Sequence, residues 1–407
     1  MLLIIFARLN GGLTMNIREL RNMFPALSRT VYGKQLVYFD NAATAQRSQS
    51  VIDKWTQLTI GANANIHRAV HKLAVDATDE YESTRDAVKE YINAAAREEI
   101  VFTSGTTGSI NLVAFSFGET FVNKGDEIIV SESEHHSNIV PWQMLCQRKG
   151  AVLRVLHVDE DGHLNLEELK SLLNPKTRIV AVTQISNVLG ILNPVKEIVS
   201  ICHSTGCPVL IDGAQGMVHE GVDVQDVDCD FYAFSGHKLY AATGTGVLYG
   251  KRKWLDQMVP YQGGGEMIAT VRFSGTTYAP LPEKFEAGTQ NINAIPTLEP
   301  AIEMLKLMKD KELLNAQEAV SQYLLHALTS NPRIRLYGVP RGTETKIPLF
   351  SFSVEGAHHE DLALILDKMG IAVRSGQMCA EPLMDRFGVT GMLRASLAPY
   401  NTMEEAE

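Results

Sequence analysis

The stretch Asp212-Gly-Ala-Gln215, followed by Asp228-Cys-Asp-Phe-Tyr-Ala-Phe-Ser-Gly-His-Lys238, decides how this chain folds and what it binds. Each motif follows or closes an apolar run of the kind that forms a buried strand. Asp212 is placed to hold a pyridinium nitrogen, and Lys238 is placed to form a Schiff base. These are the two groups that pyridoxal 5'-phosphate (PLP) needs from a protein. A lone lysine after an apolar run is usually structural, but this ordered set is far more specific.

Around these motifs, short β-branched runs alternate with helical stretches. Strands are expected at 99–103, 127–131, 152–157, 178–184, 209–212, 230–235 and 246–249. Helices are expected at 76–93, 107–117, 165–173 and 195–203. This alternation predicts an α/β fold built on a mostly parallel sheet flanked by helices. The last two strands follow each other with little helix between them, so part of the sheet is expected to be antiparallel.

The pattern changes near Pro296, where a smaller α+β domain is expected. It comprises a long helix from 300 to about 328, strands at 346–354 and 371–374, and a helix at 360–369. We therefore predict a large PLP-binding domain at 31–295 and a small domain at 296–407. Residues 16–30 are expected to pack with the small domain. The apolar run that opens the chain, Met1-Leu-Leu-Ile-Ile-Phe-Ala, is too short to span a bilayer, and we expect residues 1–15 to form an extension outside the fold.

Composition limits the class of partner and the compartment. The 407 residues are 45% hydrophobic and 21% charged, with a net charge of −10. This balance argues against a nucleic-acid or membrane partner, which would call for a basic face. The five cysteines are odd in number, and a chain of this length does not need disulfides. We expect a cytoplasmic protein with free thiols, in which Cys202 and Cys207 serve packing.

A phosphate site is expected where Ser104-Gly-Thr-Thr107 opens a helix directly after a strand. Helix N-termini offer unpaired N–H groups to a phosphate, and Thr106 and Thr107 add hydroxyl donors. The alternative is an ordinary threonine N-cap. The presence of Lys238 downstream favours phosphate binding.

Glu134-His135-His136 follows the strand expected at 127–131. An imidazole at the carboxyl end of a strand can stack on a planar cofactor. Paired histidines can also bind a metal, but no carboxylate or cysteine lies at a specific ligand spacing, so no metal site is predicted. His67 and His71 have i, i+4 spacing but lack the glutamate of a zinc-protease helix.

Arg374-Ser-Gly-Gln-Met-Cys379-Ala places a cysteine in a glycine-containing loop just after an apolar strand. We expect this thiol to be exposed and mobile, and nearby cations favour its reactive thiolate. A small buried residue is the alternative. Arg394 follows close by, where its guanidinium could clamp a substrate carboxylate. Alone, Arg394 would more often be a surface charge.

With these motifs in order, the sequence resembles the SufS/CsdA-type cysteine desulfurases, within the class V aminotransferase family of fold-type I PLP enzymes. The resemblance runs from Phe24 to Asn401 and includes Asp40-Asn-Ala-Ala-Thr, Val140-Pro-Trp-Gln, Ser186-Asn-Val and Glu286-Ala-Gly-Thr. It implies a fold-type I enzyme with a large and a small domain, and conversion of L-cysteine to L-alanine. The sulfur would become a persulfide on Cys379 and pass to an acceptor of the SufE/CsdE kind, for iron–sulfur cluster or cofactor assembly.

The resemblance also implies residue roles. Residues expected to hold PLP are Thr106, Thr107, His135, Asp212, Gln215, Ser235, His237 and Lys238, with Thr289 arriving from the other subunit of a homodimer. Residues expected to hold the substrate are His67, Asn187, Arg374 and Arg394. Lys238 would carry the cofactor and exchange the Cα proton, His135 would stack on the ring and relay protons, and Cys379 would attack the substrate sulfur.

The chain departs from the family pattern at Ser104, Gly108, Ala241, Ala242 and Met378. Met378 replaces a histidine, so we expect Cys379 to be less activated by its neighbour. The chain also stops at Glu407, where the family continues with a helix. Selenocysteine or cysteine sulfinate could be preferred on the same scaffold. A non-catalytic homologue that binds a partner is the alternative from another class, although Lys238, Asp212 and Cys379 argue against it.

Overall fold

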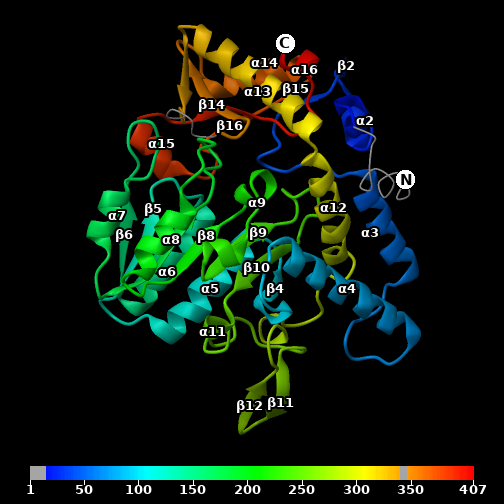
Figure 1. Cartoon of the computed structure of the whole chain (residues 1–407), viewed down its shortest axis with the longest axis vertical. Coiled ribbons are helices and arrows are strands. Elements are labelled where there is room, and N and C mark those ends of the chain that lie inside the picture. The colour runs from blue at the N-terminus through cyan, green and yellow to red at the C-terminus, as the bar shows by residue number, and fades with distance from the viewer. Residues whose placement is uncertain (1–14, 340–345) are drawn as a thin grey trace.

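The computed structural model describes residues 15–339 and 346–407, so the extension expected over residues 1–14 lies outside the described part. A seven-stranded sheet forms the centre of the molecule, in the order β4-β10-β9-β8-β7-β5-β6 (Figure 1). Its strands are β4 (Ile100–Thr103), β5 (Glu127–Ser131), β6 (Val152–Leu156), β7 (Thr177–Thr183), β8 (Val209–Asp212), β9 (Phe231–Ser235) and β10 (Gly246–Gly250). Strands β5 to β9 pair in parallel, and β10 is antiparallel to β9 and β4. The predicted α/β class and the antiparallel part are confirmed.

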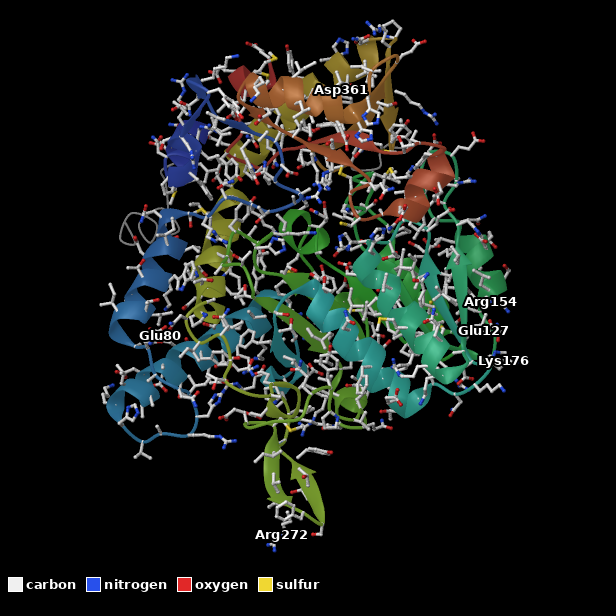
Figure 2. All side chains as sticks on the ribbon, turned by 180° about the vertical axis from the view of Figure 1, so that it is seen from behind. Glu80, Glu127, Arg154, Lys176, Arg272 and Asp361 are labelled. Atoms are coloured by element: carbon white, nitrogen blue, oxygen red, sulfur yellow. The ribbon has the colours of Figure 1, made fainter. Side chains whose placement is uncertain are left out.

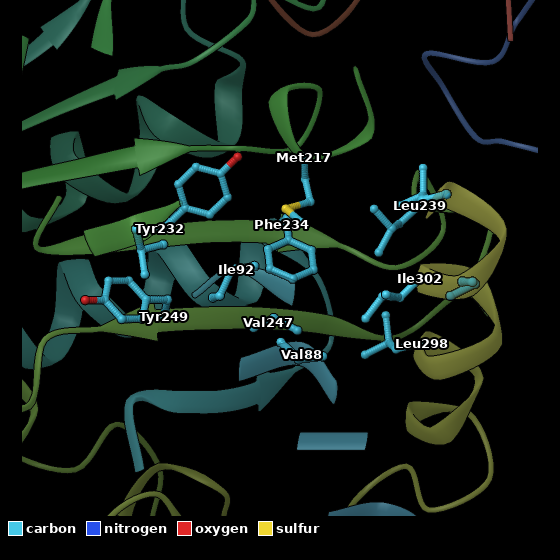
Figure 3. Close-up of a cluster of buried hydrophobic side chains, with 14 of the residues drawn as sticks. Val88, Ile92, Met217, Tyr232, Phe234, Leu239, Val247, Tyr249, Leu298 and Ile302 are labelled. Carbon is cyan, nitrogen blue, oxygen red and sulfur yellow. The ribbon is translucent and has the colours of Figure 1, made fainter. Parts of the chain in front are cut away.

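Helices cover both faces of this sheet. They are α3 (Gln49–Gly61), α4 (Lys72–Tyr91), α5 (Thr106–Phe121), α6 (Val140–Lys149), α7 (Leu166–Leu172), α8 (Val195–His203), α9 (Gly216–His219), α10 (Val224–Val227) and α11 (Arg252–Leu255). Alternate side chains of each strand enter different cores because successive residues of a strand point to opposite faces. On β9, Phe231 packs toward α5 and α6, whereas Tyr232 and Phe234 pack in the core that includes α4 (Figure 3).

A second, four-stranded antiparallel sheet lies toward the C-terminus, in the order β13-β14-β17-β16. Its strands are β13 (Ile334–Tyr337), β14 (Leu349–Val354), β16 (Arg374–Gly376) and β17 (Met392–Ser396). Helices α13 (Lys311–Ser330) and α14 (His359–Lys368) contact it. The N-terminal strand β3 (Val37–Tyr38) pairs with β15 (Ile371–Ala372). The division into domains at 295/296 stays a prediction.

Most predicted elements are present, and the differences have local causes. Helix α4 begins four residues before its predicted start because the His71 side chain caps it, accepting from the Ala74 amide. The helical stretch predicted from 300 to about 328 is present but is divided into two helices, α12 (Leu298–Met308) and α13. Asp310 separates them by capping the second, where its side chain accepts from the Glu312 amide. The strand predicted at 371–374 is split between β15 and β16, which join different sheets.

Several elements were not predicted. Helix α2 (Ile17–Arg21) lies against α16 (Met403–Ala406), where Arg21 and Glu405 form an ion pair of 2.8 Å. Helix α15 (Glu381–Phe387) follows Cys379. A hairpin of β11 (Ile268–Arg272) and β12 (Gly275–Tyr278) projects from the body of the molecule, with Arg272 near its tip (Figures 1 and 2). No helix among the described residues has the length and apolar character needed to cross a bilayer.

Candidate active site

A cavity of about 160 Å³ opens at the carboxyl ends of the parallel strands. Loops at this edge of an α/β sheet are where ligands bind. The cavity brings together most of the residues predicted for the site, which are Thr106, Thr107, His135, Asn187, Asp212, Gln215, Ser235, His237, Lys238, Arg374, Cys379 and Arg394. Segments far apart in the sequence, including the C-terminal sheet, therefore contribute to a single site.

Lys238 and Asp212 are oppositely charged residues that line the cavity and interact electrostatically with each other. Burial lowers the pKa of Lys238 to about 8, although Asp212 opposes this shift. Arg394 and Arg374 lower it further. An amine with a lowered pKa has a larger nucleophilic fraction near neutral pH. Asp212 is held at the end of β8, where its Oδ1 accepts from the Ala214 amide at 2.9 Å.

The N-terminus of α5 lines the same cavity as Lys238. Gly105 is the N-cap and makes no side-chain capping bond, so the prediction of a threonine N-cap as the alternative is wrong. The Thr106 amide and hydroxyl lie 2.8 and 2.7 Å from the Ser235 hydroxyl. A Cβ at Gly246 would lie 2.3 Å from the Gly105 Cα, so only glycine permits this close approach. Uncapped helix N–H groups and hydroxyls suit the phosphate of PLP.

His135 faces the cavity as a neutral imidazole. Its Nδ1 accepts from the Ser137 amide at 3.1 Å, which leaves the ring proton on Nε2. Burial lowers the pKa of His135 to about 4, and the neighbouring Lys238 contributes in the same direction. The preceding Glu134 is buried and ties this loop to β7, because it accepts from the Thr183 amide at 2.9 Å. A neutral ring at this place can lie against an aromatic cofactor.

Two arginines from the C-terminal sheet close the other side of the cavity. Arg374 on β16 lies opposite Arg394 on β17. Arg394 is 2% exposed and donates to the Asn187 carbonyl at 2.8 Å and to Asp40 at 3.1 Å. Its Nε is buried and makes no hydrogen bond among the described residues. Asp40 therefore orients a guanidinium that has a donor to spare, which suits a carboxylate ligand.

Cys379 lies in the cavity wall and is half-buried, so the expectation of an exposed thiol is wrong. The loop is held by neighbours: Asn187 Nδ2 donates to the Met378 carbonyl at 2.8 Å, and the His136 amide donates to the Cys379 carbonyl at 2.7 Å. Met378 is 3% exposed and packs in an apolar cluster with Leu383. The other cysteines are buried, including Cys202 and Cys207 as expected.

His67 and Thr289 are the two predicted site residues that do not line this cavity in the described chain. The His67 Nε2 pairs with Glu82 at 3.0 Å. Thr289 is exposed. Conversely, the prediction missed His136 and Asp40, which hold other site residues in place. The only signal for them was their position inside the motifs Glu134-His-His and Asp40-Asn-Ala-Ala-Thr.

A lysine beside an acid, an anion cradle and a mixed sheet that places them at one edge define the class of fold-type I PLP enzymes. More narrowly, the chain belongs to the class-V aminotransferase family, whose model matches residues 37–407. A cysteine desulfurase of Pectobacterium atrosepticum is 47% identical over 392 residues, which are 96% of this chain and 95% of that protein.

Solved structures agree with this family. The cysteine desulfurase CsdA of Escherichia coli, in an S-sulfonic acid form, has a TM-score of 0.87 and 39% identity, covering 97% of this chain and 96% of its own. The apo cysteine desulfurase of Thermococcus onnurineus has a TM-score of 0.90 and 35% identity over the same shares.

Proposed function

We propose that this protein is a PLP-dependent cysteine desulfurase that converts L-cysteine to L-alanine and keeps the sulfur as a persulfide on Cys379. The observation that carries the proposal is that one cavity is lined by Lys238, Asp212 and Cys379 together. A cofactor lysine and a nucleophilic thiol facing the same small space support transfer of sulfur from a bound amino acid. The identity to known cysteine desulfurases over nearly the whole chain supports the same activity.

The residues present fit PLP at each of its polar groups. Lys238 would hold the aldehyde carbon through its amine, and Asp212 would pair with the ring nitrogen. Thr106, Thr107, Ser235 and His237 would hold the phosphate, and Gln215 would bind the ring hydroxyl. When bound, PLP withdraws electrons from the substrate Cα and so weakens its C–H bond.

The chain's own residues orient the substrate and move the proton. Arg394, with Arg374 and Asn187, would bind the substrate carboxylate and so fix the direction of Cα. Asn187 Nδ2 gives one N–H to the Met378 carbonyl and retains a second for this carboxylate. The Lys238 amine would take the Cα proton, and neutral His135 would lie over the cofactor ring.

Cys379 would perform the sulfur transfer. Its thiolate attacks the substrate sulfur, so that an S–S bond forms as the C–S bond breaks. The three-carbon remainder takes up protons and leaves as L-alanine. Cysteine and one enzyme thiol are thereby converted to alanine and one enzyme persulfide, with no external oxidant.

We further infer a homodimer, an acceptor protein of the SufE/CsdE kind and a cytoplasmic location. A second copy is favoured because Thr289, which was expected to come from the other subunit, lies outside its own chain's cavity. An acceptor protein would remove the persulfide before the next turnover, a step that a thiol reductant can perform in its place. Iron–sulfur cluster or cofactor assembly would consume the sulfur.

The test is a substrate comparison on purified protein. Borohydride should fix PLP to the peptide that contains Lys238, and L-cysteine with a reductant should yield alanine and sulfide in equal amounts. The kcat/KM values for cysteine, selenocysteine and cysteine sulfinate then rank the substrates. A protein that does not take up PLP, or that makes no alanine from any of the three, would favour the non-catalytic alternative.

A further inference from the structure

The Cys379 loop is anchored on both sides of the thiol. On one side, the Met378 carbonyl accepts from Asn187 at 2.8 Å. On the other side, the Glu381 amide donates to the His136 Nε2 at 3.0 Å. Between them, the Cys379 carbonyl accepts from the His136 amide at 2.7 Å. Two of these three bonds come from the same residue, His136.

The backbone at this place needs such anchors. Met378 and Cys379 have φ angles of 54° and 56°, the left-handed region that residues with a Cβ rarely adopt. Conformations of this kind persist only where the surroundings hold them. The next segment begins α15, whose first amides have no partner within the helix. The His136 ring satisfies one of them, that of Glu381.

His136 stands next to His135 but faces away from the cofactor region. His135 lines the cavity, whereas His136 does not, and the two ring centroids are 6.3 Å apart. Because Nε2 accepts from an amide, the His136 ring keeps its lone pair there and carries its proton on Nδ1. The ring and the backbone amide of His136, which lies in the loop that follows β5, thus hold the chain at Glu381 and at Cys379.

We propose that His136 is a positioning residue for sulfur transfer, which holds the left-handed Cys379 loop so that the thiol faces the cavity beside Lys238. This role rests on the proposed desulfurase function. His136 touches neither the cofactor region nor the reacting sulfur. Its removal should therefore affect the step performed by Cys379 and spare the step performed by Lys238.

The two steps can be measured separately on the holoenzyme. Exchange of the Cα proton of L-alanine into D2O, followed by NMR, reports Lys238 chemistry without any thiol. Alanine formation from L-cysteine reports both steps. His136→Leu removes the ring acceptor but leaves the backbone amide, and His136→Gln supplies a carbonyl oxygen that can accept from Glu381.

We expect His136→Leu to lower kcat for L-cysteine about 10-fold or more, since a displacement of about 1 Å at a reacting group can cost that much. The KM for L-cysteine and the exchange of alanine should stay at wild-type values. His136→Gln should recover kcat to within about threefold, because it restores the bond to Glu381. The control His326→Leu, on the exposed part of α13, should match wild type in both assays.

Three results would overturn the proposal. The first is desulfuration of cysteine by His136→Leu at the wild-type rate. The second is loss of both alanine exchange and desulfuration in His136→Leu. The third is a His136→Gln variant that is as impaired as His136→Leu. Failure of the function itself has a different signature: wild type would exchange alanine or bind PLP yet produce no alanine from cysteine.

Discussion

Cys379 differs from the other cysteines in where the backbone places its thiol. Burial raises the pKa of Cys202 to about 12 and also raises that of Cys146, so these thiols stay protonated and unreactive. Cys379 alone lines the cavity with Lys238. We predict that Cys379→Ser keeps the PLP colour and alanine exchange but loses sulfide release from L-cysteine. Cys146→Ser serves as the control and should keep activity. Normal desulfuration by Cys379→Ser would show that the nucleophile is elsewhere.

Met378 is the neighbour that departs from the family pattern, and its side chain is 3% exposed among apolar residues such as Leu383 and Met384. A histidine there would place a polar ring among these apolar side chains. We predict that Met378→His lowers the free energy of unfolding by about 1–3 kcal/mol. Met369→His, at a position that is 50% exposed, should change it little. Denaturant unfolding measures both. Unchanged stability with faster basal turnover would instead mean that residue 378 acts on the thiol.

The site residues could be predicted to the extent that each follows a strand. Asp212 and Ser235 end β8 and β9, and parallel strands bring their carboxyl ends to one edge. The contacts of His136 and Asp40 could not be predicted, because each joins a loop to a segment more than two hundred residues away. The position of Cys379 depends on a distant contact of the same kind, the hydrogen bond from the His136 amide to the Cys379 carbonyl.

At the scale of elements, a buried ion pair joins α4 to the segment that precedes Thr289. Arg85 and Glu286 form two hydrogen bonds of 2.7 and 2.9 Å, and both side chains are nearly inaccessible. Glu286 also accepts from the Phe102 amide on edge strand β4 at 2.7 Å. Removing one partner leaves an uncompensated buried charge. We predict that Arg85→Met lowers the free energy of unfolding by about 3–5 kcal/mol.

The matched control for this pair is Arg154→Met on β6. Arg154 pairs with Glu127 at 2.7 Å, but its side chain is 47% exposed at the edge of the sheet (Figure 2). Screening by water makes such a pair weak, so thermal unfolding should change little. Equal losses in the two variants would contradict the distinction between buried and exposed pairs.

The bounds of elements were predictable where every residue of a short apolar run is buried, and less so where a cap or a strand pairing sets the end. Strands β5 and β8 have their predicted ends. The break between α12 and α13 depends on one cap at Asp310, which interrupts an apolar stripe that continues past it. The hairpin of β11 and β12 has no buried face, so no apolar alternation marks it in the sequence.

At the scale of the whole molecule, a partly buried histidine makes stability depend on pH. Burial lowers the pKa of His219 to about 4, and Lys238 adds to the shift. The unfolded pKa is about 6.5. Between these values the unfolded chain binds more protons, so this stabilisation is complete above about pH 6.5 and is lost as the pH falls toward 4.

The contribution of His219 to the free energy of unfolding is measured in the cofactor-free protein, because the charge of a bound phosphate would change the electrostatic field at His219. Burial raises the pKa of Glu134 to about 8, so the contribution of Glu134 to stability falls as the pH rises. Comparison with His219→Gln, which keeps Glu134, isolates the contribution of His219. When the pH falls from 7 to 4, the free energy of unfolding should decrease more for wild type than for His219→Gln. Parallel curves would contradict the prediction.

The proposed homodimer is a property of the whole molecule. Thr289 is exposed in its own chain and lies outside the cavity, three residues after Glu286, which is fixed by its ion pair with Arg85. We infer that the Thr289 hydroxyl reaches the phosphate in a second subunit. We predict a dimer in sedimentation, and weaker PLP retention in Thr289→Ala by about 1.5–3 kcal/mol, the value of one hydrogen bond to a charged group. Thr276→Ala, on the exposed hairpin, should retain PLP as wild type does. A monomer with full PLP occupancy would refute the shared site, because no second chain would then be needed to complete the phosphate cradle.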